Sequence, residues 1–201
     1  MDQQRALTPV GEQRAATVAA QLERMRPATF AHSRRVAALA VRVARHAHIP
    51  APLVAEIYWG ALVHDVGELS VKRAVLDKPG PLDERERAIL AEHTIVGARW
   101  LGAVPGLVPL LPFARWHHER FDGTGYPDGA SADKIPITVA LVAVCDAWDA
   151  LTELRPYRAP MSYEDAAAEM WRHAGRQWSR SLVTWLLECL DLERIGDDAG
   201  A

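Results

Sequence analysis

The sequence HHERFDGTGYP at residues 117–127 places a pair of histidines directly before a glycine-rich turn. Adjacent histidines are poor core residues, because each buried imidazole needs a hydrogen-bond partner or a metal ion. On a helix the two rings would lie about 100° apart, which suits two neighbouring metal ions. Gly123, Gly125 and Pro127 then end the helix and hold Tyr126 above the histidines. The stretch therefore predicts a metal site with a substrate-binding tyrosine over it.

The sequence on both sides of this stretch is helical, with apolar residues spaced three and four positions apart. It contains no alternating strand pattern of useful length and no internal repeat. A chain of 201 residues, 49% of them hydrophobic, can bury one substantial core, so we expect an all-α fold with one compact helical domain. Helices are expected over residues 10–25, 29–48, 52–66, 84–101, 110–116, 137–151, 162–175 and 179–194, with a loop over residues 72–81.

Composition limits the partners and the location of the protein. A net charge of −3 with acids and bases interspersed offers no broad surface for duplex nucleic acid, although it leaves room for a local phosphate pocket. No stretch approaches the roughly 18 apolar residues of a membrane span, and the N-terminus lacks a signal-peptide pattern. Cys145 and Cys189 lie in apolar helical stretches and are expected to be buried, reduced thiols. We therefore expect a cytoplasmic protein with no membrane or duplex partner.

Several histidines and aspartates fall on apolar faces, where a charge or an imidazole needs a partner. His64 and Asp65 follow the most apolar part of the expected helix 52–66, and a metal ion there would neutralise the acid and fix the imidazole tautomer. Asp146 is the first acid after Asp133 and lies within a strongly apolar helix. The candidate metal ligands are His32, His64, Asp65, His93, His117, His118 and Asp146.

These seven candidates are too many for one tetrahedral zinc ion. Imidazole and carboxylate ligands without a thiolate suit iron, manganese, zinc and similar divalent ions, and a carboxylate such as Asp65 can bridge two of them. Two metals about 3.5 to 4 Å apart can bind a bridging hydroxide and polarise a phosphoryl oxygen. The pattern therefore predicts two divalent metal ions and the hydrolysis of a phosphoester.

The series His32, His64-Asp65, His93 and Asp146 resembles the HD superfamily of metal-dependent phosphohydrolases. The sequence HHERFDGTGYP and the later DALTELRPYR resemble its HD-GYP branch, and the resemblance covers roughly residues 29–175. It implies an all-helical HD-type domain that hydrolyses cyclic di-GMP or a related cyclic dinucleotide by attack of a metal-bridging hydroxide. It also implies iron as the first choice of metal, with manganese or another divalent ion as the alternative.

The resemblance assigns roles to further residues. Tyr126 would contact the ligand, and Arg155 and Arg158 would lie near its phosphate or guanine. An aromatic face and guanidinium groups are what a ligand with two phosphates and flat bases requires. His64 and Asp65 are expected to hold the nucleophile.

Two positions depart from the family pattern. The family usually carries a lysine where this chain has Glu68, so a carboxylate replaces a cation that would reach the substrate phosphate. Glu68 is assigned to the catalytic centre, where its charge would repel the phosphate, change the choice of substrate, or recruit a cation between the acid and the phosphate. Lys72 and Arg73 are the candidates to replace the missing lysine. Trinuclear members carry a glutamate where this chain has Ala28, so we expect two metals. Glu68 is an alternative source of the carboxylate that this glutamate would supply to a third metal. We favour the other interpretation, in which Glu68 is a solvated acid in a loop.

The expected division of the chain follows from these assignments. Residues 1–28 are expected to form a tail and a covering helix, residues 29–195 the HD-GYP-like phosphohydrolase domain, and residues 196–201 a polar tail. A stand-alone domain of this kind is expected to bind a cyclic dinucleotide, with a homodimer or a signalling protein as a further partner. Two alternatives stay open, a catalytically weak or inactive metal-containing module that binds the dinucleotide, and a phosphohydrolase acting on another nucleotide.

Overall fold

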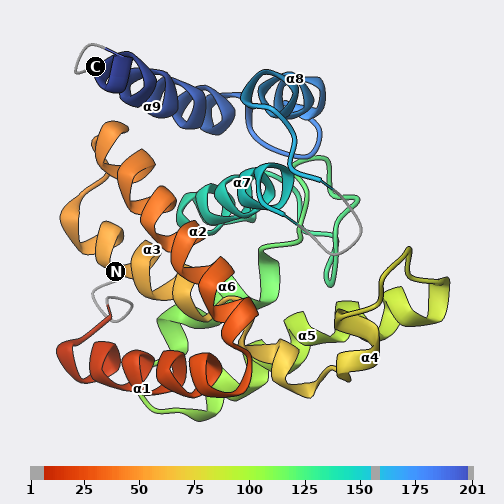
Figure 1. Ribbon diagram of the computed structural model, residues 1–201. Coiled ribbons are helices and arrows are strands. Elements are labelled where there is room, and N and C mark those ends of the chain that lie inside the picture. Colours follow the sequence, from red (N-terminus) through yellow and green to blue (C-terminus); the bar gives the residue numbers. More distant parts are fainter. Residues whose placement is uncertain (1–6, 155–158, 199–201) are drawn as a thin grey trace.

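The computed structural model describes residues 7–154 and 159–198, and within these ranges the fold is helical without a β-strand (Figure 1). The predicted all-α class is therefore confirmed. The elements are α1 (Pro9–Met25), α2 (Pro27–His46), α3 (Ala51–Val63), η1 (Val66–Ser70), α4 (Arg73–Leu76), α5 (Glu84–Ala103), η2 (Val108–Leu110), α6 (Leu111–Trp116), α7 (Ile137–Thr152), α8 (Tyr163–His173) and α9 (Arg180–Asp198). Among the described residues, no helix combines the length and the apolar composition that a membrane crossing needs.

Helices α2, α3 and α7 pack against one another and form the centre of the molecule. Helix α1 covers α2 and α3 along one edge, and α9 packs on α2 and α7 at the opposite edge (Figure 1). The stripe of Val36, Ala40 and Val43 on α2 is buried, because residues spaced three and four apart lie on one face of a helix. The boundary predicted between residues 28 and 29 stays a prediction.

Helix α7 is apolar on most of its surface because it has neighbours on several sides. It contacts α2, α3, α6, α8 and α9, and Val139, Val142 and Val144 are buried. A helix enclosed in this way reads as a nearly continuous apolar run in the sequence. Cys145 on α7 and Cys189 on α9 are buried thiols that form no disulfide with each other, as predicted.

The segment between α3 and α5 differs from the prediction. Residues 72–81 were expected to form a loop, but Arg73–Leu76 forms the short helix α4. One helical turn is too short to show an apolar period in the sequence, which is why the pattern missed it. The next helix begins as predicted, because the Asp83 side chain accepts a hydrogen bond from the Glu86 backbone and Glu86 accepts one from Asp83.

Gly67 allows the turn η1 to lie directly against α5. A Cβ atom on Gly67 would lie 1.9 Å from the carbonyl oxygen of His93 and 2.8 Å from the backbone nitrogen of Gly97. Helix α3 ends at Val63, three residues before the predicted end of this helix at residue 66. The role of Gly67 is therefore close approach between backbones, which brings the segment after α3 next to His93.

We predict that Gly67→Ala destabilises the fold by about 3 kcal/mol or more, because the new methyl group overlaps backbone atoms that cannot rotate away. Chemical denaturation of the metal-free protein measures this loss. Gly80→Ala is the matched control, because a Cβ at Gly80 has nothing within 4 Å. Equal stability of the two variants would contradict the close approach.

Candidate metal centre

The seven residues predicted as metal ligands lie together where five helices meet. His32 is on α2, His64 and Asp65 follow α3, His93 is on α5, His117 and His118 follow α6, and Asp146 is on α7. Three overlapping groups have potential ligand atoms within 4.8 Å of one another: His93, His117 and His118; His32, His64 and Asp146; and His64, Asp65 and His117. The structure brings all seven together, and the ligand role of each stays a prediction.

Three of the imidazoles are oriented by the backbone of their own helices. In each, Nδ1–H donates to a carbonyl oxygen three or four residues earlier, which leaves Nε2 facing the interior of the cluster. The bonds join His64 to Ala61 (2.7 Å), His93 to Leu90 (2.6 Å) and His117 to Phe113 (2.8 Å). The backbone therefore fixes the same tautomer in all three rings.

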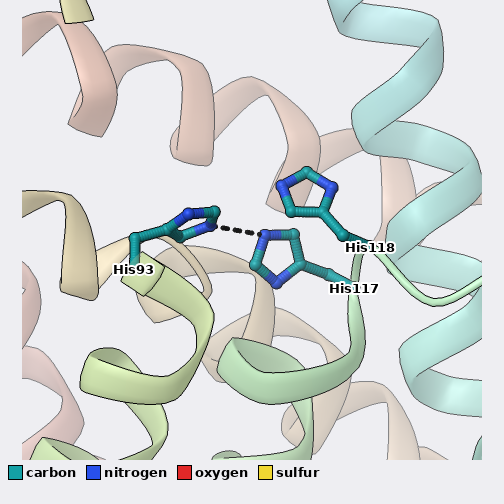
Figure 2. A group of neighbouring side chains, drawn as sticks. All are labelled: His93, His117 and His118. Atoms are coloured by element: carbon teal, nitrogen blue, oxygen red, sulfur yellow. Dashed lines mark hydrogen bonds between the residues drawn. The ribbon is translucent and has the colours of Figure 1, made fainter. Parts of the chain in front are cut away.

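The Nε2 atoms that this orientation presents need a cation. Those of His93 and His117 lie 3.1 Å apart (Figure 2), so in the neutral rings two lone pairs face each other. The buried Nε2 of His64 has no hydrogen-bond partner among the described residues. Such buried acceptors are costly unless a proton or a metal ion lies between them. The donor set therefore fits a divalent metal centre.

Asp65 lies between the histidine groups with one oxygen turned to each. Its Oδ1 is 3.5 Å from Nε2 of His93 and 3.4 Å from Nε2 of His117. Its Oδ2 is 3.2 Å from Nε2 of His64 and 3.8 Å from Nε2 of His32. Two ligand atoms about 2.1 Å from one ion lie about 3.0 to 3.4 Å apart, close to these separations. This is the arrangement of a carboxylate that can bridge two ions.

Charges in the cluster compensate one another. Burial opposes the charge of His32, but hydrogen bonds with Asp146 and Asp149 outweigh burial and raise its pKa to about 10. Its Nε2 is 3.0 Å from Oδ1 of Asp146. Burial also opposes the charge of Asp65, yet the surrounding histidines hold its pKa well below the usual range. The carboxylates thus stay negative, which favours a bound cation.

The histidine pair that follows α6 differs from the prediction in one respect. Helix α6 ends at Trp116, so His117 is its C-cap residue and His118 lies beyond the helix. The two ring centroids are 4.0 Å apart, and both rings belong to one group with His93 (Figure 2). His117 also faces the group with His64, so the expected assignment of the two rings to two separate ions is too simple. Burial, followed by the neighbouring His117, holds the pKa of His118 well below its ordinary value, so His118 stays neutral.

The glycine-rich turn holds Tyr126 over the histidines, as predicted. The ring of Tyr126 lies 4.9 Å from that of His118, and its side chain remains 37% exposed. A Cβ on Gly125 would lie 2.4 Å from the backbone nitrogen of Arg120, so this turn requires glycine. Burial and the charge of Asp65 raise the pKa of the Tyr126 hydroxyl, which remains a neutral donor. Contact of Tyr126 with a substrate stays a prediction.

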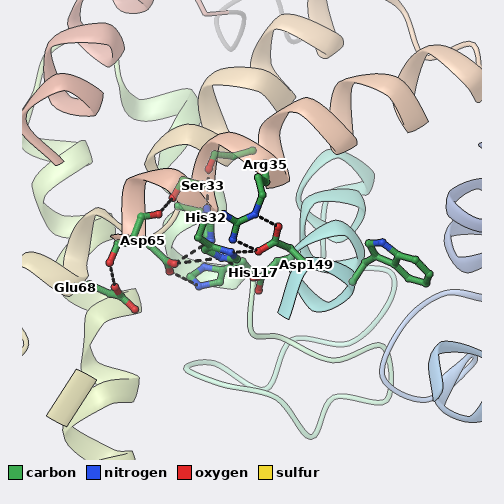
Figure 3. Close-up of polar contacts among 12 residues, drawn as sticks. His32, Ser33, Arg35, Asp65, Glu68, His117 and Asp149 are labelled. Atoms are coloured by element: carbon green, nitrogen blue, oxygen red, sulfur yellow. Dashed lines mark hydrogen bonds and ion pairs between the residues drawn. The ribbon is translucent and has the colours of Figure 1, made fainter. Parts of the chain in front are cut away.

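Glu68 is not the solvated loop acid that we expected. It lies on η1 and is partly buried, and its Oε2 accepts a hydrogen bond of 2.7 Å from Oγ1 of Thr29 on α2 (Figure 3). Burial and the charge of Asp65 raise its pKa to about 7. The sequence does not show that η1 packs beside the first turn of α2, which is why the prediction was wrong. Arg155 and Arg158, the other predicted substrate contacts, lie outside the described residues.

Two polar residues beside His32 were missed by the sequence analysis. Asp149 accepts a hydrogen bond from Nδ1 of His32 at 2.6 Å, and Arg35 donates to both oxygens of Asp149 (Figure 3). A signal was present, since Arg35 and Asp149 each lie three residues after a predicted ligand, on the same face of a helix. Their side chains therefore belong to the surroundings of the site.

Glu119 was also missed, and it holds the glycine-rich turn in place. Its buried carboxylate accepts hydrogen bonds from the backbone nitrogens of Asp128 at 2.6 Å and Ala130 at 2.9 Å. Asp128 in turn accepts a hydrogen bond from the indole of Trp116. These contacts tie the end of the turn to the end of α6, and no local sequence pattern reveals them.

Comparisons with known proteins agree with this geometry. The HD domain family matches residues 17–182. A cyclic di-GMP phosphodiesterase of Thermotoga maritima is 36% identical over 162 residues, covering 80% of this chain and 44% of that protein. The 3'3'-cGAMP-specific phosphodiesterase 3 of Vibrio cholerae is 40% identical over 147 residues, covering 72% and 31%. This chain thus spans less than half the length of either relative.

A solved structure shares the fold. Bd1817, an HDG"Y"P protein from Bdellovibrio bacteriovorus, aligns with a TM-score of 0.67 at 23% sequence identity. The alignment covers 80% of this chain and 51% of that chain. At this identity the likeness establishes the helical architecture.

We predict that binding of Mn(II) releases at least one proton. With a pKa of about 10, His32 is protonated at neutral pH in the metal-free fold, and it must lose this proton to act as a ligand. The apparent affinity then rises by up to about tenfold per pH unit for each proton lost, from about pH 7 to about pH 10.

Calorimetry in buffers of different ionisation enthalpy counts the protons. His32→Gln should lower the count, whereas His46→Gln, which alters a histidine beside Glu188 outside the cluster, should not. A binding heat that does not depend on the buffer would contradict the prediction.

Proposed function

The chain belongs to the HD domain family, in its HD-GYP branch, and on this premise we propose that it is a metal-dependent phosphodiesterase acting on a cyclic dinucleotide. The observation that carries the proposal is the position of Asp65, whose two oxygens face different groups of histidines. A pair of ions joined by a carboxylate is a common arrangement for hydrolysis of a phosphodiester.

We propose two divalent ions. His32, His64 and Asp146 would hold one ion, His93, His117 and His118 the other, and Asp65 would contact both. Two such ions polarise a phosphoryl oxygen and lower the pKa of bound water. Iron is the proposed metal and manganese the alternative, because imidazole and carboxylate donors without a thiolate suit both.

The proposed substrate class rests on the relatives and on the rim of the site. The two relatives named above act on cyclic di-GMP and on 3'3'-cGAMP, which share two phosphodiester bonds and flat purine bases. Tyr126 presents a partly exposed aromatic face beside His118, which suits a flat base. In this proposal Tyr126 binds the base, and Arg155 and Arg158 contact a phosphate or guanine.

The protein's own groups have defined tasks in this reaction. His64 and Asp65 would hold the reacting centre, because Nε2 of His64 lies 3.2 Å from Oδ2 of Asp65 within the cluster. Tyr126 keeps its proton and can donate a hydrogen bond to an oxygen of the substrate. Glu119 fixes the turn that carries Tyr126, so the tyrosine is positioned before the substrate arrives.

Glu68 supports a second candidate function, a module that binds the dinucleotide but hydrolyses it slowly or not at all. A carboxylate stands where relatives of this branch usually place a lysine, and Thr29 holds it beside the cluster. When ionised, Glu68 would repel a substrate phosphate. Action on another nucleotide is the remaining alternative. The proposed cytoplasmic location, homodimer or signalling partner, and division at residues 28 and 195 stay predictions.

We predict that the protein, loaded anaerobically with Fe(II) or Mn(II), converts cyclic di-GMP or 3'3'-cGAMP into linear dinucleotide or mononucleotides. Asp65→Ala and His64→Ala should lower turnover by more than about 1000-fold and reduce the bound metal, because each removes a central donor. Chromatography of the products and metal analysis of the same sample measure both effects. Asp133→Ala, which alters an exposed acid away from the cluster, is the control. Turnover that survives both Asp65→Ala and His64→Ala rules out the assignment.

We predict that Glu68→Lys raises kcat/KM for the cyclic dinucleotide by about tenfold, because an ammonium group replaces a repelling charge. Glu68→Gln separates the two effects, since it removes the charge, keeps an acceptor for Thr29 and adds no cation. Steady-state kinetics with equal metal loading gives the comparison. A fall in rate for both variants means that Glu68 has a catalytic task of its own, and ligand binding without turnover in the unaltered protein supports the binding module.

A further inference from the structure

His32 differs from the other three oriented histidines in what lies behind its ring. Nδ1 of His64, His93 and His117 donates to a backbone carbonyl, whereas Nδ1 of His32 faces Oδ2 of Asp149 at 2.6 Å. An ionised carboxylate is a stronger acceptor than a carbonyl, and it makes the opposite nitrogen a stronger metal ligand. The group of His32, His64 and Asp146 therefore contains a stronger nitrogen donor than the group of His93, His117 and His118.

Arg35 keeps the Asp149 carboxylate charged and fixed. Its Nε lies 2.6 Å from Oδ1 and its Nη2 lies 2.9 Å from Oδ2, a two-pronged contact that leaves the plane of the carboxylate little freedom (Figure 3). The side chain of Asp149 is only 6% exposed, while that of Arg35 is 43% exposed. Oδ2 is thus shared between Arg35 and His32.

The contact also joins the two helices that carry ligands of one group. His32 and Arg35 lie on α2, whereas Asp146 and Asp149 lie on α7, and these helices pack together in the core. Nε2 of His32 lies 3.0 Å from Oδ1 of Asp146 on the other side of the ring. The imidazole is therefore held at both nitrogens by carboxylates of the same helix.

We propose that Asp149, held by Arg35, is a positioning residue that fixes the tautomer and orientation of His32 and makes the ion at His32, His64 and Asp146 the more tightly bound of two. This inference rests on the two-ion site of the proposed function. It concerns metal binding, so it can be tested without any substrate.

The test is titration of the metal-free protein with Mn(II), followed by calorimetry and by electron paramagnetic resonance. The unaltered protein should bind two ions with separate affinities, and the spin-coupled signal of an ion pair should appear only with the second. Asp149→Asn removes the charge behind His32 and, once the affinities are corrected for the protons released on binding, should weaken one binding step by about 10- to 100-fold while leaving the other unchanged. Asp149→Glu, which restores a carboxylate, should recover part of the loss.

Glu153→Gln is the matched control, because Glu153 lies 3.8 Å from Nε of Arg35 and does not support the His32 ring. It should leave both binding steps unchanged. Thermal melting with and without Mn(II) separates positioning from structural support: Asp149→Asn should reduce the stabilisation by metal more than it reduces the stability of the metal-free fold.

Three results would overturn the proposal: binding of one ion or none by the unaltered protein, equal weakening of both steps in Asp149→Asn, or equal loss of stability with and without metal. Failure of the proposed function looks different. In that case Mn(II) titration gives the expected pattern for every variant, but the loaded protein leaves cyclic di-GMP and 3'3'-cGAMP intact.

Discussion

The structure depends on a buried carboxylate, Asp65, that cannot be stable without compensating charge. Burial alone would raise the pKa of this group, yet the histidines that surround it hold the pKa well below the usual range. Those histidines come from α2, α3, α5 and the end of α6, so one charge draws segments distant in sequence to one point. The fold and the site therefore share a single electrostatic requirement.

Two places where backbone segments lie in direct contact help to bring the histidines around Asp65. Gly67 lets η1 touch the backbone of α5 beside His93, and Gly125 lets the turn fold back on Arg120. Neither position tolerates a methyl group, so both glycines serve the spacing of the metal donors and the tyrosine above them. The cluster is consequently tied to the backbone, and its geometry does not depend on side-chain flexibility.

Much of this arrangement could be predicted from the sequence, because the signals were local. Apolar spacing gave the helices, and histidines or acids on apolar faces gave the seven clustered residues. Arg35 and Asp149 escaped because they pair across 114 residues of the chain, and polar residues with distant partners look like ordinary surface residues. Glu119 escaped because its partners are backbone nitrogens of the following turn, and no side-chain pattern marks them. Glu68 was misread for the same reason as Arg35 and Asp149, since its contact with Thr29 spans two helices that no period or motif relates.

The hydrogen bonds from His64, His93 and His117 to carbonyls of their own helical turns have a mechanical consequence. Each ring is fastened to the helix that bears it, so it moves as a rigid part of that helix. Displacing α5 against α3 by about 1 Å would change the separation of the nitrogens by a similar amount, which is enough to impair a reaction that depends on position. The geometry of the cluster therefore depends on the alignment of these helices, and a neighbouring segment that shifts one of them would change the distances between the candidate ligand atoms.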